Sequence, residues 1–197
     1  MPGNILGDGQ AFLGLEGDAA VVLVLGVTGG GLRRVVAAAS KADGKQEQAT
    51  ESDPKVKVKA SSYARAKDLP LGLDFPPESI LDGSGASPWI ADAKDDQRTL
   101  TISFQNVVEC NVIRISPAVL PALGPGYLSR PVEVEVEING KDKQRLAMDP
   151  DPLHPMQLEL AHKTQIRRLD LRILAVALSP ASALVGLGEV ELFLRKN

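Results

Sequence analysis

Apolar and polar residues alternate along most of the chain from Lys55 to the C-terminus. The clearest segment is 131–138, where three valines and an isoleucine alternate with Glu133, Glu135 and Glu137. Successive side chains of a β-strand point to opposite faces, so this period of two predicts a strand with one buried and one solvated face. The same pattern predicts further strands at 55–60, 99–104, 111–116, 156–160, 169–173 and 190–194.

The connections between these segments favour antiparallel pairing. Asn139-Gly140 directly follows the segment 131–138, and this dipeptide favours the positive-φ turn that closes a hairpin. Seven or so short strands, each with one wet face and separated by loops rich in proline and glycine, predict an all-β protein. We expect two antiparallel layers stacked as a β-sandwich.

Composition divides the chain into three parts. Residues 1–43 are rich in glycine, alanine and valine and form an N-terminal arm. Within it, 21–25 predicts a strand, a glycine-rich turn follows, and 32–40 fits either a short helix or a returning strand. Residues 44–54 are polar, lack periodicity and end in proline, which is typical of a linker. The sandwich is expected over 55–197.

Bulk composition excludes several classes of partner. The chain has 197 residues, of which 44% are hydrophobic and only 4% aromatic, so its core depends on aliphatic side chains. The net charge of −3 offers no general attraction for nucleic acid or an anionic membrane. Cys110 is the single cysteine, so no intrachain disulfide can form. We interpret it as a packing residue, because nothing nearby favours a thiolate.

The sequence shows no evident signal peptide or membrane span. The apolar run 19–27 is shorter than the ~20 residues that cross a bilayer. Asp8, Glu16 and Asp18 precede it, where a signal peptide has basic residues. We therefore expect a cytoplasmic protein, or one assembled into a particle, without a transmembrane segment.

One motif carries a family resemblance. Residues 82–89 read Asp-Gly-Ser-Gly-Ala-Ser-Pro-Trp, and a late carboxylate, Glu189, adjoins an apolar strand near the C-terminus. An aspartate turn, a single tryptophan, amphipathic strands and a late glutamate resemble the discoidin-like domains, also called F5/8 type C or galactose-binding-like domains. The resemblance implies a jelly-roll β-sandwich that binds a partner rather than converting a substrate. It places Trp89 in the core, closing one end of the sandwich.

The resemblance also implies a structural calcium ion. Its side-chain ligands would be Asp82 and Glu189, with loop carbonyls near Ser84 and Ser87, since Ca²⁺ prefers six to eight hard oxygen ligands. This sequence departs from the family pattern at Ser84, where a second aspartate is usual, and one negative charge is missing as a result. The alternative is that Asp82 only caps the turn through backbone N–H groups.

Ligands of this fold bind in the loops at one end of the sandwich, which here would be 61–79, 117–130 and 179–187. An aromatic face combined with charged side chains is typical of sugar sites. The candidate ligand-binding residues are Tyr63, Arg65, Tyr127 and Arg130. The alternative is that these residues are merely solvated. The loops are also rich in leucine, which favours contact with a protein or membrane if those side chains are exposed.

Three functions follow from these observations. The main hypothesis is a non-catalytic recognition and assembly module, a structural subunit of a larger complex such as a virion or injection apparatus, with protein neighbours or copies of itself as partners. The first alternative is a carbohydrate-binding module. The second is a dinucleotide-binding protein, in which Gly26, Gly29, Gly30 and Gly31 would seat a phosphate at a helix N-terminus. No catalytic motif stands out, so we do not expect an enzyme.

Overall fold

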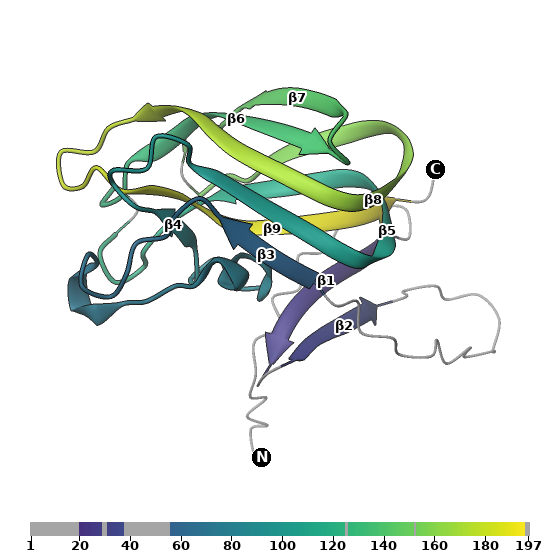
Figure 1. Ribbon diagram of the computed structural model, residues 1–197, viewed down its shortest axis with the longest axis horizontal. Coiled ribbons are helices and arrows are strands. Elements are labelled where there is room, and N and C mark those ends of the chain that lie inside the picture. Colours follow the sequence, from purple (N-terminus) through teal and green to yellow (C-terminus); the bar gives the residue numbers. More distant parts are fainter. Residues whose placement is uncertain (1–19, 29–30, 38–55, 125, 152, 196–197) are drawn as a thin grey trace, which may run out of the picture.

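The computed structural model describes residues 20–28, 31–37, 56–124, 126–151 and 153–195, the first two of these ranges by their backbone alone. These residues form strands and two short 3₁₀ helices (Figure 1). In chain order they are β1 (Ala20–Thr28), β2 (Gly31–Ala37), β3 (Val56–Ala60), η1 (Pro70–Gly72), η2 (Pro77–Leu81), β4 (Trp89–Ala91), β5 (Thr99–Pro117), β6 (Arg130–Ile138), β7 (Asp142–Ala147), β8 (Met156–Ala177) and β9 (Val185–Arg195).

The strands form two layers that share the long strands β5 and β8. The front layer, facing the viewer in Figure 1, consists of β3, residues 99–104 of β5, residues 168–177 of β8, β6 and β7. The rear layer consists of residues 112–117 of β5, residues 156–159 of β8, and β9, to which β1 and β2 are added at the edge. Among the described residues, the named strands pair antiparallel in the order β2-β1-β9-β5-β8-β6-β7, with β3 paired to β5 and β4 paired to β9.

A single aliphatic core lies between the layers. Ile102, Val136 and Leu171 from the front layer pack in one cluster with Ile113 and Leu192 from the rear layer. Each of these side chains is at most 2% exposed. The predicted all-β sandwich is therefore confirmed, with Val134, Val136 and Ile138 buried as the alternation predicts. The prediction is wrong for Val132, which is 36% exposed, because the register of β6 with β8 shifts between Pro131 and Val134. Within the described part of the chain, no helix is both long and apolar enough to cross a membrane.

The predicted strand segments differ from the observed ones in two main respects: β4 and β7 were not predicted, and two pairs of segments are joined into long strands. The segments 156–160 and 169–173 both belong to β8. The segments 99–104 and 111–116 are parts of one strand, β5, in which the register with β8 shifts between Ser103 and Val108. The predicted turn is confirmed: Asn139 and Gly140 have φ of +54° and +72° and join β6 to β7. A β-bulge keeps a strand continuous while bending it, so a break in alternation does not end β5.

The N-terminal segment adds a hairpin to the sheet. β1 pairs with β9 from Ala20↔Arg195 to Leu23↔Leu192, and β2 returns along β1. Of the two possibilities for 32–40, its described part is therefore a strand. A strand lacks the free N–H groups that a helix N-terminus presents to a phosphate, so the dinucleotide hypothesis loses its mechanism. The predicted linker 44–54 lies outside the described residues, and the predicted domain boundaries stay predictions.

Candidate functional site

The three loops predicted to bind a ligand gather at one end of the sandwich. They share a second apolar cluster, which we call the tip cluster, separate from the main core. Its buried members come from all three loops and from β4. They are Ala64 and Leu69 of the first loop, Ile90 of β4, Ala118, Leu120 and Leu128 of the second loop, and Leu184 of the third loop. This end of the molecule is therefore a packed structure and not a set of independent loops.

Hydrogen bonds join the second and third loops. Ser129 is 1% exposed, and its hydroxyl donates to the carbonyl of Ser182 at 2.7 Å and accepts from the backbone N–H of Ser179 at 2.9 Å. The Ser179 hydroxyl in turn donates to the carbonyl of Gly126 at 2.8 Å. Buried hydroxyls that use both their donor and acceptor capacity hold a loop in one conformation.

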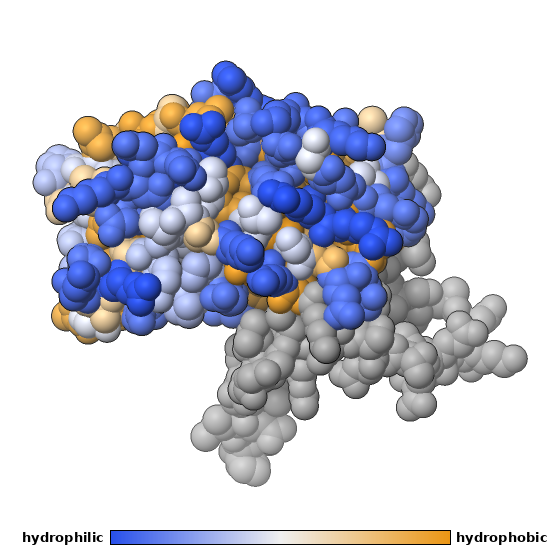
Figure 2. All heavy atoms as spheres, in the orientation of Figure 1, coloured by the Kyte–Doolittle hydropathy of each residue, from blue (hydrophilic) through white to orange (hydrophobic). Residues whose placement is uncertain are grey.

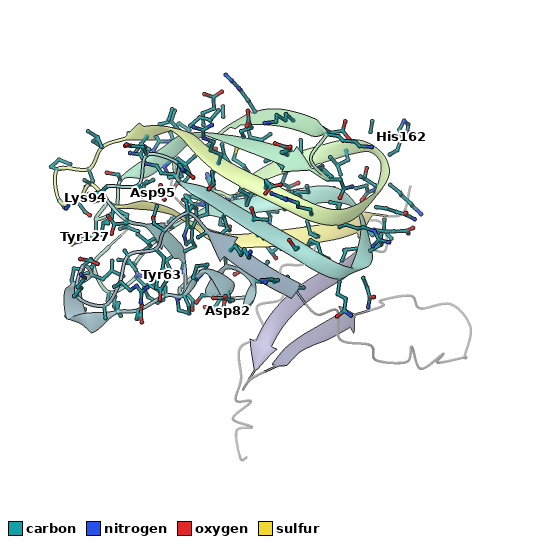
Figure 3. All side chains as sticks on the ribbon, in the orientation of Figure 1. Tyr63, Asp82, Lys94, Asp95, Tyr127 and His162 are labelled. Carbon is teal, nitrogen blue, oxygen red and sulfur yellow. The ribbon has the colours of Figure 1, made fainter. Side chains whose placement is uncertain are left out.

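Two of the predicted ligand residues form a pair in the first loop. The guanidinium of Arg65 lies over the ring of Tyr63, 4.5 Å from its centroid. Tyr63 is half-buried against the main core, whereas Arg65 is exposed. Tyr127 from the second loop is half-buried against the tip cluster. Figure 3 places Tyr63 and Tyr127 at the same end of the molecule, opposite His162.

Arg130 is engaged elsewhere. Its Nη1 donates to the carbonyl of Asp149 at 3.1 Å, which ties the start of β6 to the loop after β7. The leucines predicted to be exposed divide into two groups. Leu69 is buried in the tip cluster, but Leu71 is 74% exposed, and Leu178, next to the third loop, is 77% exposed.

The sequence did not single out Asp95, which anchors the same end of the molecule. Its Oδ2 accepts from the hydroxyls of Ser61 and Ser62, the latter at 2.6 Å, and its Oδ1 accepts from the backbone N–H groups of Gln97 and Arg98. Partial burial acts to raise the pKa of Asp95, but these four hydrogen bonds outweigh it and leave the pKa below its usual value. No local pattern predicts contacts between residues more than thirty positions apart.

Two of the predicted metal ligands, Asp82 and Glu189, lie close together at the C-terminal end of η2. Glu189 on β9 is 7% exposed, and its Oε1 accepts from the N–H of Gly83 at 3.3 Å, while its Oε2 has no hydrogen-bond partner among the described residues. Asp82 accepts from the N–H of Ser84 at 2.7 Å, as the capping alternative requires. The carbonyl of Ser84 accepts from Ser87 at 3.2 Å. Asp82 thus caps its turn and also faces a buried glutamate.

This arrangement fits a cation. Burial, followed by the negative charge of Asp82, raises the pKa of Glu189 to about 9. A positive ion between the two carboxylates would occupy the unpaired Oε2 and cancel their repulsion. Within the described ranges, no group of three or more histidine, cysteine, aspartate or glutamate side chains is placed to hold a metal. Further ligands would therefore be loop carbonyls, the Ser84 or Ser87 hydroxyls, or water.

Trp89 and Cys110 have structural roles, as predicted. Trp89 is fully buried in the main core, and its indole N–H donates to the carbonyl of Ser62 at 2.9 Å. Cys110 is fully buried in the same core, and burial raises the pKa of its thiol to about 12. A thiol with such a pKa is not a nucleophile at neutral pH.

No protein-family model matches the sequence. No curated protein is significantly similar to it. Solved structures do share its fold. The family 32 carbohydrate-binding module of Clostridium perfringens NanJ, solved in complex with galactose, is 13% identical, with a TM-score of 0.50 over 70% of this chain and 93% of that one. The F5/8 type C domain of a Bacteroides fragilis protein is 13% identical, with a TM-score of 0.52 over 72% and 93%.

A third similar structure is the module CBM32-3 from a family 31 glycoside hydrolase of Clostridium perfringens. It is 14% identical, with a TM-score of 0.51 over 72% of this chain and 92% of that module. At these identities the similarity establishes the fold. The chain has the discoidin-like sandwich of F5/8 type C and family 32 domains, as the motif around Asp82 and Trp89 predicted.

Proposed function

We propose that this protein is a non-catalytic carbohydrate-binding module whose tip loops bind a neutral, galactose-type sugar. The observation that carries the proposal is the joining of three loops on the tip cluster, against which Tyr127 packs, at the same end of the molecule as the stacked Tyr63–Arg65 pair (Figure 3). A binding surface held rigid before the ligand arrives loses little entropy on binding. An aromatic ring beside a guanidinium matches the mixed apolar and hydroxyl surface of a sugar.

The similar structures favour this alternative over the main sequence hypothesis. Two of the three reported are carbohydrate-binding modules, and one of those holds galactose. None of the three is described as a virion or injection-apparatus component. The role as an assembly subunit therefore stays a prediction, and the exposed Leu71 and Leu178 are the side chains with which a protein neighbour would make contact.

Calcium is part of the proposal as a structural ion. Asp82 and Glu189 would supply the carboxylates, and the loop 83–87 would supply neutral oxygens. The ion would neutralise a pair of carboxylates that otherwise repel each other. η2 packs against β9 and precedes β4. An ion bound there would therefore stabilise the segment that leads into the tip cluster, without contacting the sugar.

Calorimetric titration tests the binding site. Galactose should bind the wild-type protein saturably, and Arg65→Ala and Tyr127→Ala should each weaken binding roughly tenfold, since each removes one charge-assisted hydrogen bond or one aromatic contact. Lys67→Ala is the matched control: it removes an exposed cation two residues from Arg65. Wild-type affinity in both Arg65→Ala and Tyr127→Ala, or equal weakening by Lys67→Ala, would rule out the proposed site.

A further inference from the structure

The outer face of the front layer carries side chains of both charges. On β6, Glu135 lies between Arg145 of β7 and Arg172 of β8, and Glu137 lies between Lys143 of β7 and Asp170 of β8. Beyond β8, the outward positions of β5 are hydroxyl residues. Figure 2 shows hydrophilic side chains over much of the face formed by β3, β5 and β8. The predicted wet face of 131–138 is thus one column of a wider polar surface.

This surface contains a hollow, which we call the front-face hollow, of about 400 Å³. Its volume falls within the range of small-molecule sites. It exists because short residues such as Thr99, Thr101 and Gly140 lie among long ones. The lining residues are Thr99, Thr101, Glu135, Glu137, Gly140, Lys143, Arg168, Asp170, Leu171 and Arg172.

Most of the charged lining is held in place by internal contacts. The Nζ of Lys143 lies 2.8 Å from Oε2 of Glu137. Arg168 lies 2.7 Å from Asp170, which also accepts from the Thr101 hydroxyl at 2.6 Å. In these contacts, cations and carboxylates of the lining pair with one another, which fixes their side chains before any ligand binds.

Arg172 is the exception. It lines the hollow, yet its guanidinium makes no ion pair or hydrogen bond with any residue in the described ranges. Its neighbours in the register are Thr99 on β5 and Glu135 on β6. Glu135 pairs instead with Lys143, whose Nζ lies 3.4 Å from Glu135 Oε1. The Thr99 hydroxyl has no hydrogen-bond partner within the described chain. A guanidinium and a hydroxyl side by side can both donate hydrogen bonds to one oxyanion.

We propose that the front-face hollow binds a sugar acid carrying one carboxylate. The carboxylate would pair with Arg172 and accept from the Thr99 hydroxyl, and the sugar hydroxyls would donate to Glu135 and Glu137. Of the three cations in the lining, Lys143 and Arg168 are paired with carboxylates, so Arg172 is left to pair with one negative charge. The lining has no aromatic side chain, which separates this site from the tip in chemistry as well as in position.

The test is a titration of ¹⁵N-labelled protein with galacturonate, and with galactose as the neutral counterpart, followed by amide chemical shifts. Galacturonate should produce saturable shifts at Thr99, Thr101 and Arg172, and galactose should not shift these amides. Arg172→Gln should weaken galacturonate binding roughly tenfold or more. Arg167→Gln, which removes an exposed cation from the same strand outside the hollow, should bind like the wild type.

The proposal is overturned if galacturonate produces no saturable shift on this face, if Arg172→Gln binds it as the wild type does, or if Arg167→Gln weakens binding equally. The last result would show that only the net charge matters. Each outcome is independent of the tip, because galactose binding at Tyr127 and galacturonate binding at Arg172 are read from different amides in the same spectra.

Discussion

Replacing Glu189 by glutamine should change how the stability of the fold depends on pH. The glutamate is buried on β9, with Asp82 nearby and one carboxylate oxygen that has no hydrogen-bond partner in the described part of the chain. Glutamine has nearly the same shape but does not titrate. A difference between the two proteins that grows with pH therefore reports the ionisation of this one side chain.

The magnitude follows from the raised pKa of Glu189, about 9 in the folded protein, against about 4.3 in an unfolded chain. A carboxyl group whose folded pKa is the higher one contributes stability that is fully present below the unfolded value. That contribution is lost as pH rises toward the folded value, because the folded state binds the proton more tightly. The loss is about 1.4 kcal/mol per pH unit. Between about pH 5 and about pH 8 the wild type should lose roughly 4 kcal/mol of this contribution.

The assay is urea unfolding of both proteins at these two pH values in the presence of EDTA. The free energy of unfolding of Glu189→Gln, minus that of the wild type, should rise by about 4 kcal/mol between pH 5 and pH 8. Glu78→Gln, an exposed carboxylate in the same η2 segment, should show no such rise. A parallel pH dependence for wild type and Glu189→Gln would refute the reasoning, because it would mean that Glu189 ionises without cost.

Other predictions concern the same end of the molecule. In EDTA-treated protein at pH 8, added Ca²⁺ should raise the melting temperature of the wild type but not that of Glu189→Gln; equal shifts would place the ion elsewhere. Gly186→Ala should destabilise the fold by about 3 kcal/mol in urea unfolding, because its Cβ would lie 2.0 Å from the carbonyl oxygen of Trp89. Gly85→Ala, with no atom within 4 Å of its added Cβ, is the control and should have a much smaller effect. Asp95→Asn should melt below the wild type at pH 7, and the difference should shrink near pH 3, since a lowered pKa gives stability that is lost as pH falls; a difference that does not depend on pH would contradict this.

The front and rear layers were predictable where alternation is strong. The alternation in 131–138 and 169–173 predicted both strands, and it predicted the buried faces correctly except at Val132, because period two is a local signal. β7 was missed because it is an edge strand with mostly exposed residues, and β4 because it has only three residues. Short and solvated strands depend on tertiary pairing, which no local pattern records.

The candidate sites were predictable only in part. The resemblance carried by the segment 82–89 identified Asp82 and Glu189 together, although they are more than a hundred residues apart in the chain. It could not show that one oxygen of Glu189 is unpaired. No sequence pattern pointed to Arg172. Its lack of a partner depends on its cross-strand register with Glu135 and on the ion pair that Glu135 makes with Lys143 instead.

The binding of a neutral sugar by the tip loops is tested most directly by mapping galactose onto the ¹⁵N-labelled protein. The account predicts saturable chemical-shift changes at Arg65, at Tyr127 and at amides around Leu184, with the strands left unchanged. A titration without any saturable change at these three places, or with changes confined to the opposite end near His162, would contradict it.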